Sequence, residues 1–366
     1  LSDTDPRAAD LALTLDAGGT LAAHEDDAAD PTALVLATSG STGNPKGVLL
    51  SAGQLAASAS ATEARLGGPG QWLLTLPAEH IAGMQVLLRA ARAGTEPLVL
   101  DREKPFAAAG FATIAHRLPG PRRYVSLVPT QLARVLADAH ATAVAADVFD
   151  AILVGGAATP PSLLEKARAA GLSIVTTYGM TETCGGCVYN EVPLGGVTAS
   201  INDAGAIVLT GSMVARGYRG RPHDPAFASS GSFVTSDAGI TSVDSDSVTR
   251  LIITGRVDDV IVSGGVNVAP AAVESAIRAL PGIASTMVIG VPDSQWGRAV
   301  TALIVPEPAG RRWTIAELRA ALTGLPATHR PHRLEMVDSI PQLPSGKPDR
   351  LQAASCYLER HIHPAG

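Results

Sequence analysis

Residues 33–47 read Ala33-Leu-Val-Leu-Ala-Thr-Ser-Gly-Ser-Thr-Gly-Asn-Pro-Lys-Gly47, an apolar run followed by a loop rich in glycine and hydroxyl side chains. The run predicts a buried strand, and the three glycines let the loop backbone curl until several N–H groups face one anion. The candidate phosphate-binding residues of the loop are Thr38, Ser39, Ser41, Thr42 and Lys46. Its spacing differs from the Walker pattern, which argues against a P-loop ATPase. The alternative is a flexible linker, but a linker would not lie between a buried strand and a helix.

Around this loop, short apolar runs alternate with longer stretches whose apolar residues recur at helical spacing. The runs are 33–37, 71–76, 97–100, 124–128, 151–154 and 173–176, and helices are expected after Leu76, Pro129 and Pro160. Strands that alternate with helices indicate an α/β fold with a mainly parallel sheet and flanking helices. Ligands of such sheets bind at the carboxyl ends of the strands.

The pattern changes after Gly185, where the runs 206–209, 232–235 and 248–253 are separated by Gly, Asp and Ser. This spacing predicts a small antiparallel β subdomain. Beyond Asp258 we expect a compact α+β unit with helices at 270–280 and 314–322 and strands at 286–291 and 300–305. The predicted domains are therefore a large N-terminal α/β domain over 1–257 and a small C-terminal α+β domain over 258–366.

The composition narrows the class of protein. Hydrophobic residues make up 46% of the 366 residues and charged residues 17%, as in a globular chain. The net charge of −6 supplies no basic face, which argues against nucleic acid and anionic lipid as partners. Three cysteines are too few for a disulfide framework and suggest a reducing compartment. Without a leader pattern or an apolar run of about 20 residues, we expect a cytoplasmic protein with no membrane insertion.

Four later segments, together with the loop, resemble motifs of the acyl-adenylate-forming superfamily, which comprises acyl-CoA synthetases, luciferases and adenylation domains. They are Tyr178-Gly-Met-Thr-Glu182, Gly231-Ser-Phe-Val-Thr-Ser-Asp237, Gly255-Arg-Val-Asp-Asp-Val-Ile-Val-Ser-Gly-Gly-Val-Asn267 and Pro344-Ser-Gly-Lys-Pro-Asp-Arg350. They occur in the family's order over nearly the whole chain. Ser236 departs from the pattern, since it replaces a usual glycine. The phosphate loop also begins early, so the N-terminal subdomain is expected to be reduced.

The resemblance implies that ATP and Mg²⁺ activate a carboxylic acid as an acyl-adenylate, whose acyl group then passes to coenzyme A. Because two anions react, catalysis depends on positioning and charge neutralisation. The implied roles are magnesium ligand for Glu182, α-phosphate donor for Thr181 and cation between the reacting anions for Lys347. Further implied nucleotide contacts are Gly155, Gly156, Ala157, Tyr178, Gly179, Asp237 and Arg256. The alternatives are a helix-terminal carboxylate for Glu182, a turn residue for Asp237, a surface salt bridge for Arg256 and a solvated lysine for Lys347.

The same resemblance implies a swing of the small domain between the two half-reactions. Asp258 is the implied hinge, because hinges are a few residues that absorb a large backbone change. The loop of Ser263, Gly264 and Gly265 is then implied in the coenzyme A step. No side chain stands out as the base for the thiol of coenzyme A.

The segments 76–83, 126–132 and 181–184 resemble the 2-succinylbenzoate–CoA ligase group, which acts in menaquinone synthesis. The candidate acyl-pocket residues are His80, Arg89, Ser126 and Thr130. This acid keeps a second carboxylate, and a buried unpaired anion costs several kcal/mol, so the pocket needs a cation or several donors. The resemblance makes Arg89 the candidate cation. The alternative is an arginine that snorkels at the solvent edge.

The remaining cysteine and histidine residues have simple structural interpretations, and two alternatives to the implied function remain. Cys184-Gly-Gly-Cys187 has no second ligand pair, so no metal or redox site is expected, and His361 and His363 are expected in a frayed tail. Two alternative functions remain open, namely another aryl- or acyl-CoA ligase and a non-catalytic nucleotide-binding module. Retention of Glu182, Asp237 and Lys347 together argues against the module. The expected partners are a small carboxylic acid, ATP and CoA, and the sequence leaves a homodimer open.

Overall fold

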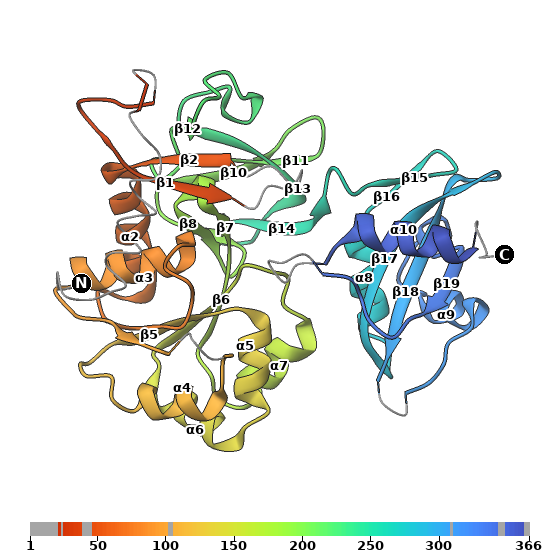
Figure 1. Cartoon of the computed structure of the whole chain (residues 1–366), viewed down its shortest axis with the longest axis horizontal. Coiled ribbons are helices and arrows are strands. Elements are labelled where there is room, and N and C mark those ends of the chain that lie inside the picture. Colours follow the sequence, from red (N-terminus) through yellow and green to blue (C-terminus); the bar gives the residue numbers. More distant parts are fainter. Residues whose placement is uncertain are drawn as a thin grey trace. The chain divides into compact units, whose positions relative to one another are not determined.

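The computed structural model describes residues 21–22, 25–38, 46–101, 105–307, 310–342 and 348–361. The chain divides into two compact units (Figure 1). Unit 1 comprises Leu1–Ser200, Val208–Thr235 and Thr241–Ile252, and unit 2 comprises Ile201–Ile207, Ser236–Ile240 and Ile253–Gly366. The domain boundary at Asp258 stays a prediction.

Unit 1 contains a seven-stranded sheet in the order β4-β3-β5-β6-β7-β8-β9. Its strands are β3 (Gln71–Leu74), β4 (Leu98–Val99), β5 (Arg123–Leu127), β6 (Ala151–Val154), β7 (Ile174–Met180), β8 (Gly185–Tyr189) and β9 (Val192–Pro193). The first five in spatial order, β4 to β7, are parallel, and β8 and β9 are antiparallel to their neighbours. The α/β fold and its mainly parallel sheet are therefore confirmed.

Helices cover both faces of this sheet (Figure 1). They are α2 (Ala52–Leu66), α3 (Ile81–Arg92), α4 (Ala108–Ala115), α5 (Pro129–Leu136), α6 (Ala139–Val148) and α7 (Pro161–Ala169). Because successive side chains of a strand point to opposite faces, Val125 and Leu127 pack with Phe111 of α4 in one core. Tyr124 points to the other face, where its hydroxyl donates to the carbonyls of Leu66 and Gly68 at the end of α2.

The predicted position of the first strand is wrong. β1 (Thr32–Thr38) lies outside the parallel sheet, in a three-stranded antiparallel sheet with β2 (Lys46–Ser51) and β12 (Gly217–Tyr218), in the order β1-β2-β12. The glycine-rich loop therefore connects two strands of a hairpin rather than a strand and a helix. The physical reason is the apolar run 48–50, which is buried and forms a second strand before α2 begins.

A four-stranded sheet in the order β10-β11-β13-β14 follows, with β10 (Val197–Ile201), β11 (Ala206–Gly211), β13 (Ser232–Val243) and β14 (Thr249–Arg256). The three strands expected after Gly185 are thus present, and β13 and β14 extend beyond the predicted bounds. Two short 3₁₀ helices are η1 (Thr181–Thr183), which precedes β8 of the seven-stranded sheet, and η2 (Pro225–Phe227), which precedes β13. The division into two units passes through β13.

The C-terminal part of unit 2 has a three-stranded sheet in which β17 (Ile283–Asp293) pairs antiparallel with β18 (Gly297–Pro306) and β18 pairs parallel with β19 (Arg333–Met336). The other elements are β15 (Ile261–Ser263), β16 (Val266–Val268), α8 (Pro270–Arg278), α9 (Ile315–Ala321), η3 (Ala327–His329) and α10 (Arg350–His361). The predicted helices and strands of the α+β unit are confirmed, whereas α10 was not expected.

Alternation along β17 explains how this sheet is covered. Val288 faces the core formed with α8 and α9, and Met287 and Ile289 face Tyr357 of α10. The imidazole of His361 stacks on the Tyr357 ring at 4.2 Å between centroids. The expectation of a frayed tail is therefore wrong for His361, and His363 lies outside the described residues. The buried face of α10 stabilises the end of the chain that the sequence suggested would fray.

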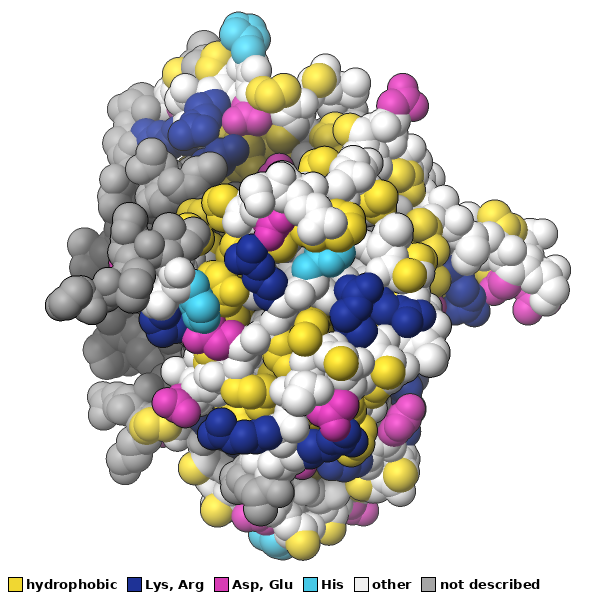
Figure 2. All heavy atoms as spheres, turned by 90° about the vertical axis from the view of Figure 1, so that its right-hand side faces the viewer, with side chains coloured by type: hydrophobic (Ala, Val, Ile, Leu, Met, Phe, Trp, Pro, Cys, Tyr) yellow, Lys and Arg dark blue, Asp and Glu magenta, His cyan; other side chains and the backbone are white. Residues whose placement is uncertain are grey.

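The surface shows no single-sign field on the face drawn in Figure 2, where basic and acidic side chains are scattered among hydrophobic and neutral ones. None of the helices in the described ranges combines the length and the hydrophobicity that crossing a membrane requires.

Candidate functional site

The two ends of the predicted phosphate loop lie opposite each other in the β1–β2 hairpin. Thr38 pairs with Lys46 in the strand register, and the Thr38 hydroxyl donates to the Lys46 carbonyl at 3.4 Å. Three other predicted phosphate contacts, Ser39, Ser41 and Thr42, lie outside the described residues. The hairpin therefore fixes where the loop begins and ends, and it places Lys46 at the start of β2.

Glu182 is a buried carboxylate, with 8% of its surface exposed. It lies in η1, directly after β7, and the Thr183 hydroxyl closes this turn by accepting from the Met180 N–H. Two contacts tie Glu182 to β12 and to the segment just before it. The Ala215 N–H donates to the Glu182 carbonyl at 2.8 Å, and the Tyr218 hydroxyl donates to Glu182 Oε1 at 2.7 Å. Both the backbone and the side chain of Glu182 are thus held in place.

The Tyr218 ring contacts Lys46, whose Nζ lies 4.3 Å from the ring centroid and 3.4 Å from Asp224 Oδ2. Phe227 packs edge-on against the same ring, with centroids 5.0 Å apart. Burial, together with the charge of Glu182, raises the pKa of the Tyr218 hydroxyl far above its usual value. Tyr218 therefore remains protonated and donates to the carboxylate at any physiological pH.

The strand register explains why these residues meet. In the pairing of β12 with β2, Tyr218 lies opposite Val48. Lys46 is two residues from Val48 on the same strand, so its side chain shares the face of the sheet on which the Tyr218 side chain lies. Sequence reasoning missed both Tyr218 and Asp224. The one available signal was the apolar run 213–215 ahead of Gly217-Tyr218, which does not identify a pairing partner so distant in the chain.

The donor set around Glu182 fits a magnesium ion. Within the described ranges, Oε2 of Glu182 has no hydrogen-bond partner, and no group of three or more His, Cys, Asp or Glu side chains is placed to hold a metal. Magnesium commonly takes one or two carboxylates and completes its shell with phosphate oxygens and water. A single buried carboxylate with one oxygen available matches that pattern, whereas a closed protein cage would not.

Other predicted nucleotide contacts lie at the carboxyl ends of parallel strands, as the fold class predicted. Gly155, Gly156 and Ala157 follow β6, and Tyr178 and Gly179 lie near the end of β7. A Cβ on Gly155 would come within 2.1 Å of Thr177 Oγ1, and one on Gly179 within 2.1 Å of the Gly185 carbonyl. Glycine is therefore required at both positions by the close approach of neighbouring strands, independently of any ligand.

In unit 2, three predicted residues form one charged group. Arg256 Nη1 lies 3.7 Å from Asp237 Oδ1, and Arg256 Nη2 lies 3.4 Å from Asp258 Oδ2. The predicted ribose residues and the predicted hinge are thus brought together. This geometry also fits the alternative of a surface salt bridge, because 37% of the Arg256 side chain and 64% of the Asp258 side chain are exposed.

The predicted loop for the coenzyme A step is the turn between β15 and β16. Gly264 and Gly265 have φ values of 56° and 80°, which other residues adopt with strain. The Ser263 side chain is buried, and its Oγ has no hydrogen-bond partner in the part of the chain that the structure describes. Lys347 lies outside the described residues.

Arg89 is buried in unit 1, with 3% of its surface exposed. Its Nη2 donates to Thr62 Oγ1 at 3.0 Å, and its guanidinium lies 5.2 Å from the centroid of the Trp72 ring. Its Nε has no hydrogen-bond partner among the described residues. The alternative of a snorkelling arginine at the solvent edge is therefore wrong.

The remaining acyl-pocket candidates differ in burial. His80 and Thr130 are exposed, at the starts of α3 and α5. Ser126 is buried near the end of β5, and its carbonyl accepts from the Thr75 hydroxyl. Within the described ranges, none of these three residues forms a hydrogen bond or ion pair with Arg89, so their common role stays a prediction.

The cysteines are unpaired, and Cys184 and Cys187 are buried. Burial raises the pKa of the Cys187 thiol to about 12 and that of Cys184 still further. The Cys184 carbonyl accepts from Ser58 Oγ and Gln85 Nε2, both at 2.9 Å, which links the residue to α2 and α3. These thiols are packed and unreactive.

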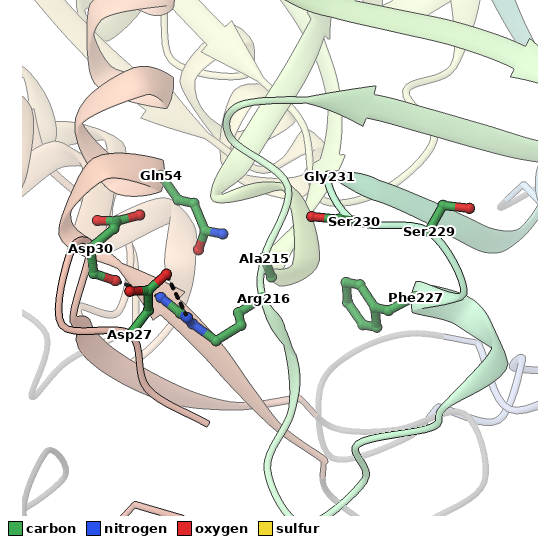
Figure 3. A pocket seen from close by; sticks show the side chains of 9 residues that line it. All are labelled: Asp27, Asp30, Gln54, Ala215, Arg216, Phe227, Ser229, Ser230 and Gly231. Atoms are coloured by element: carbon green, nitrogen blue, oxygen red, sulfur yellow. Dashed lines mark hydrogen bonds and ion pairs between the residues drawn. The ribbon is translucent and has the colours of Figure 1, made fainter. Parts of the chain in front are cut away.

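A polar cavity of about 220 Å³ lies beside this network in unit 1 (Figure 3). Its lining residues are Asp27, Asp30, Gln54, Ala215, Arg216, Phe227, Ser229, Ser230 and Gly231. Arg216 points away from Phe227 and toward Asp27, whose Oδ2 lies 3.9 Å from Arg216 Nη1. Gly231 begins the predicted ribose-binding segment, and the other lining residues were not predicted.

Comparison with known proteins agrees with the motif order. Residues 2–219 match the family model of the AMP-binding enzyme, and residues 272–347 match that of the AMP-binding enzyme C-terminal domain. The first match alone spans more than half of the chain.

Individual relatives show which members of the family this chain resembles. The "Probable 2-succinylbenzoate--CoA ligase" of Mycobacterium tuberculosis (strain H37Rv) is 43% identical over 323 residues, which are 88% of this chain and 83% of that protein. The structure of o-succinylbenzoate CoA synthetase (MenE) from Bacillus subtilis with the acyl-adenylate OSB-AMP superposes with a TM-score of 0.75 at 28% identity, covering 88% of this chain and 69% of that one. The same enzyme with ATP and magnesium ion gives a TM-score of 0.75 at 29% identity, covering 88% and 70%.

Proposed function

The chain belongs to the AMP-binding enzyme family, and from this premise we propose that it is an AMP-forming acid–thiol ligase that joins 2-succinylbenzoate to coenzyme A. The reaction passes through an acyl-adenylate and belongs to menaquinone biosynthesis. Its co-substrates are ATP and coenzyme A, and Mg²⁺ is its metal. The relative from M. tuberculosis, 43% identical over 88% of the chain, supports this reaction, as does the fold shared with an enzyme that holds OSB-AMP.

In the first half-reaction the chain positions two anions. A magnesium ion, when bound at Glu182, would neutralise part of the phosphate charge. Glu182 supplies the carboxylate ligand, Lys46 at the start of β2 supplies a cation to the phosphates, and Thr181 donates to the α-phosphate. Asp237 accepts from the ribose hydroxyls, with Arg256 as its charged neighbour at 3.7 Å. These assignments rest on motif order together with the burial of Glu182.

For the second half-reaction we propose that the small domain turns about Asp258. The exposure of the Asp258 side chain, 64%, supports this role, because a hinge residue must change its backbone angles without disturbing a core. Lys347 then serves adenylation alone, and the turn of Ser263, Gly264 and Gly265 serves thioester formation. Adenylate formation lost on Lys347→Ala, with supplied acyl-adenylate still converted, tests this division of roles.

The single observation that carries the choice of acid is the burial of Arg89. The residue is 3% exposed, and its guanidinium has no carboxylate partner among the described residues, although an unpaired buried charge costs several kcal/mol. A substrate with a second carboxylate compensates that charge. A fatty acid would leave it unmatched, so the acyl pocket favours an acid such as 2-succinylbenzoate.

The test is a panel of acids incubated with purified protein, ATP, Mg²⁺ and coenzyme A, with AMP and thioester measured together. The panel contains 2-succinylbenzoate, its analogue without the ring carboxylate, benzoate and a medium-chain fatty acid. We expect 2-succinylbenzoate to react fastest. Faster turnover of another acid would assign a different aryl- or acyl-CoA ligase, and binding of ATP without AMP release would assign a non-catalytic module.

The proposal extends to location and assembly. A cytoplasmic location is supported by three unpaired cysteines, since such thiols persist in reducing compartments. A homodimer is proposed without an assigned interface, and light scattering on the purified chain measures it directly. A monomeric mass would remove the dimer from the proposal and leave the reaction untouched.

A further inference from the structure

We infer that Tyr218 is a positioning residue that sets the magnesium carboxylate and the phosphate-loop lysine in one geometry. Its hydroxyl donates to Glu182 Oε1 at 2.7 Å, while its ring lies 4.3 Å from Lys46 Nζ. Glu182 and Lys46 thus both contact one side chain. This inference rests on the proposed function, because that proposal assigns Glu182 to the metal and Lys46 to the phosphates.

The hydroxyl of Tyr218 selects which oxygen of Glu182 is available. Oε1 accepts its hydrogen bond, and Oε2 has no partner among the residues that the structure describes. A neutral donor fixes the carboxylate plane without cancelling its charge, whereas an arginine in this place would compete with a cation. Partners that orient a metal ligand in this way usually affect metal affinity when removed.

The ring of Tyr218 acts on Lys46 by a separate contact. An ammonium near an aromatic face is attracted by the ring quadrupole. Asp224 Oδ2, 3.4 Å from Lys46 Nζ, forms an ion pair with the lysine, and Phe227 packs edge-on against the Tyr218 ring. Lys46 is therefore held at the start of β2 rather than extended into solvent, with 26% of its side chain exposed.

The two contacts use different parts of one residue, so two substitutions separate them. Tyr218→Phe deletes the hydroxyl and keeps the ring. Tyr218→Leu deletes both. Tyr124→Phe is the matched control, because the Tyr124 hydroxyl is likewise held, by the carbonyls of Leu66 and Gly68, and has no part in the proposed site.

The experiment is calorimetric titration of each protein with ATP, once with excess Mg²⁺ and once with EDTA. The dissociation constant in EDTA divided by the dissociation constant in Mg²⁺ gives the contribution of the metal to ATP binding. We expect Tyr218→Phe to reduce that ratio about tenfold and to leave the EDTA affinity unchanged. Tyr218→Leu should also weaken ATP binding in EDTA, because the loss of the ring releases Lys46. Tyr124→Phe should change neither value.

The outcomes separate this inference from the proposed function. An unchanged ratio for Tyr218→Phe, in protein whose urea unfolding shows it to be folded, would overturn the positioning role. An equal change for Tyr124→Phe would reduce Tyr218 to a structural residue and overturn it as well. A decrease of the ratio in Tyr218→Phe, together with thioester formation by the wild type on a different acid, would support the positioning role of Tyr218. It would reject only the choice of acid. A wild-type protein that binds no ATP would reject both.

Discussion

The buried charged side chains Glu182 and Arg89 of unit 1 differ from Glu274 of unit 2 in the kind of partner that binds them. In unit 1, Glu182 and Arg89 are 8% and 3% exposed, and among the described residues their side chains form hydrogen bonds with the neutral hydroxyls of Tyr218 and Thr62, respectively. In unit 2, Glu274 is 6% exposed and is bound by the guanidinium of Arg350, with Arg278 Nη1 at 3.8 Å.

The difference teaches which charges have a structural role. Glu274 also accepts from the Val288 N–H at 2.8 Å, and Arg350 reaches Asp259 Oδ2 at 2.9 Å, so charge in this cluster is matched by charge from within the chain. A buried pair of this kind is costly to break because one partner remains uncompensated. Glu182 and Arg89 have no such partner in the described ranges. We interpret their unmatched charge as reserved for ligands, a cation for one and a carboxylate for the other.

The largest effect is expected for Glu182→Gln. The amide keeps an acceptor for Tyr218 but removes the charge that binds the metal, so adenylate formation should fall about 100- to 1000-fold, the range found for loss of one electrostatic contact in a transition state. Stability should not fall, because an unmatched buried charge is removed. Pyrophosphate exchange and urea unfolding measure the two effects. A large loss of stability would place Glu182 with Glu274 as a structural charge.

Arg89→Ala is expected to cost about 2–5 kcal/mol in kcat/KM for an acid with the second carboxylate, as for truncation of one partner of a buried charge pair. An analogue without that carboxylate should react poorly with wild type and be little affected. Steady-state kinetics with both acids and both proteins form a double-mutant cycle, in which general damage to folding cancels. A coupling energy near zero would place Arg89 outside the pocket and leave His80, Ser126 and Thr130 as candidates.

Glu274→Gln tests the matched side of the comparison. We expect the free energy of unfolding of unit 2 to fall by about 2 kcal/mol. This is below the range for a fully buried pair, because Arg350 keeps its ion pair with Asp259 and 25% of its side chain is exposed. ATP affinity should be unchanged, since Glu274 contacts only structural partners. Thermal denaturation and the calorimetric titration measure the two quantities. Weaker ATP binding at unchanged stability would remove the distinction between the two units.

The smallest effect is expected at Glu317, an exposed counterpart of the matched charges. Hydrogen bonds from the Thr314 N–H and hydroxyl, and then Arg311, lower the pKa of Glu317 from 4.5 to about 2. The unfolded chain therefore binds this proton more readily, so the stabilisation is present above pH 4.5 and is lost as pH falls toward about 2. Glu317→Gln should flatten that part of the acid unfolding curve and leave stability near neutral pH only slightly lower. An unaltered acid limb would show that the capping contacts do not favour the charged form.

The parallel sheet was predictable because its signals are local. The apolar runs 124–128 and 151–154 each predict a buried strand, and Pro129 marks the start of α5, the first helix between them. The hairpin of β1 and β2 was not predictable in the same way. Its third strand, β12, is two residues long and comes from far along the chain, and two residues carry no periodicity that identifies a strand.

The candidate site shows the same limit. Motif order placed Glu182, Asp237 and Arg256, but it did not find Tyr218, which approaches Glu182 only through the pairing of β12 with β2. For Arg89 the sequence left burial and snorkelling equally open, since a single arginine in an apolar helix fits both. Burial is a property of the packed structure, and it decided between them. In α10, the buried residues Ala353 and Tyr357 are four positions apart, a spacing that places them on one helical face.

The burial of Cys184 and Cys187 has a practical consequence for spectroscopy. Their thiols are packed and hold their protons, whereas Cys356 on α10 is partly exposed and is the third and last cysteine of the chain. Since thiolate character and access govern alkylation, a maleimide dye should attach to Cys356 first. The natural sequence thus offers one addressable position on unit 2 without mutagenesis. Fluorescence of a dye at that position, followed while ATP and then coenzyme A are added, would record changes around α10 in real time.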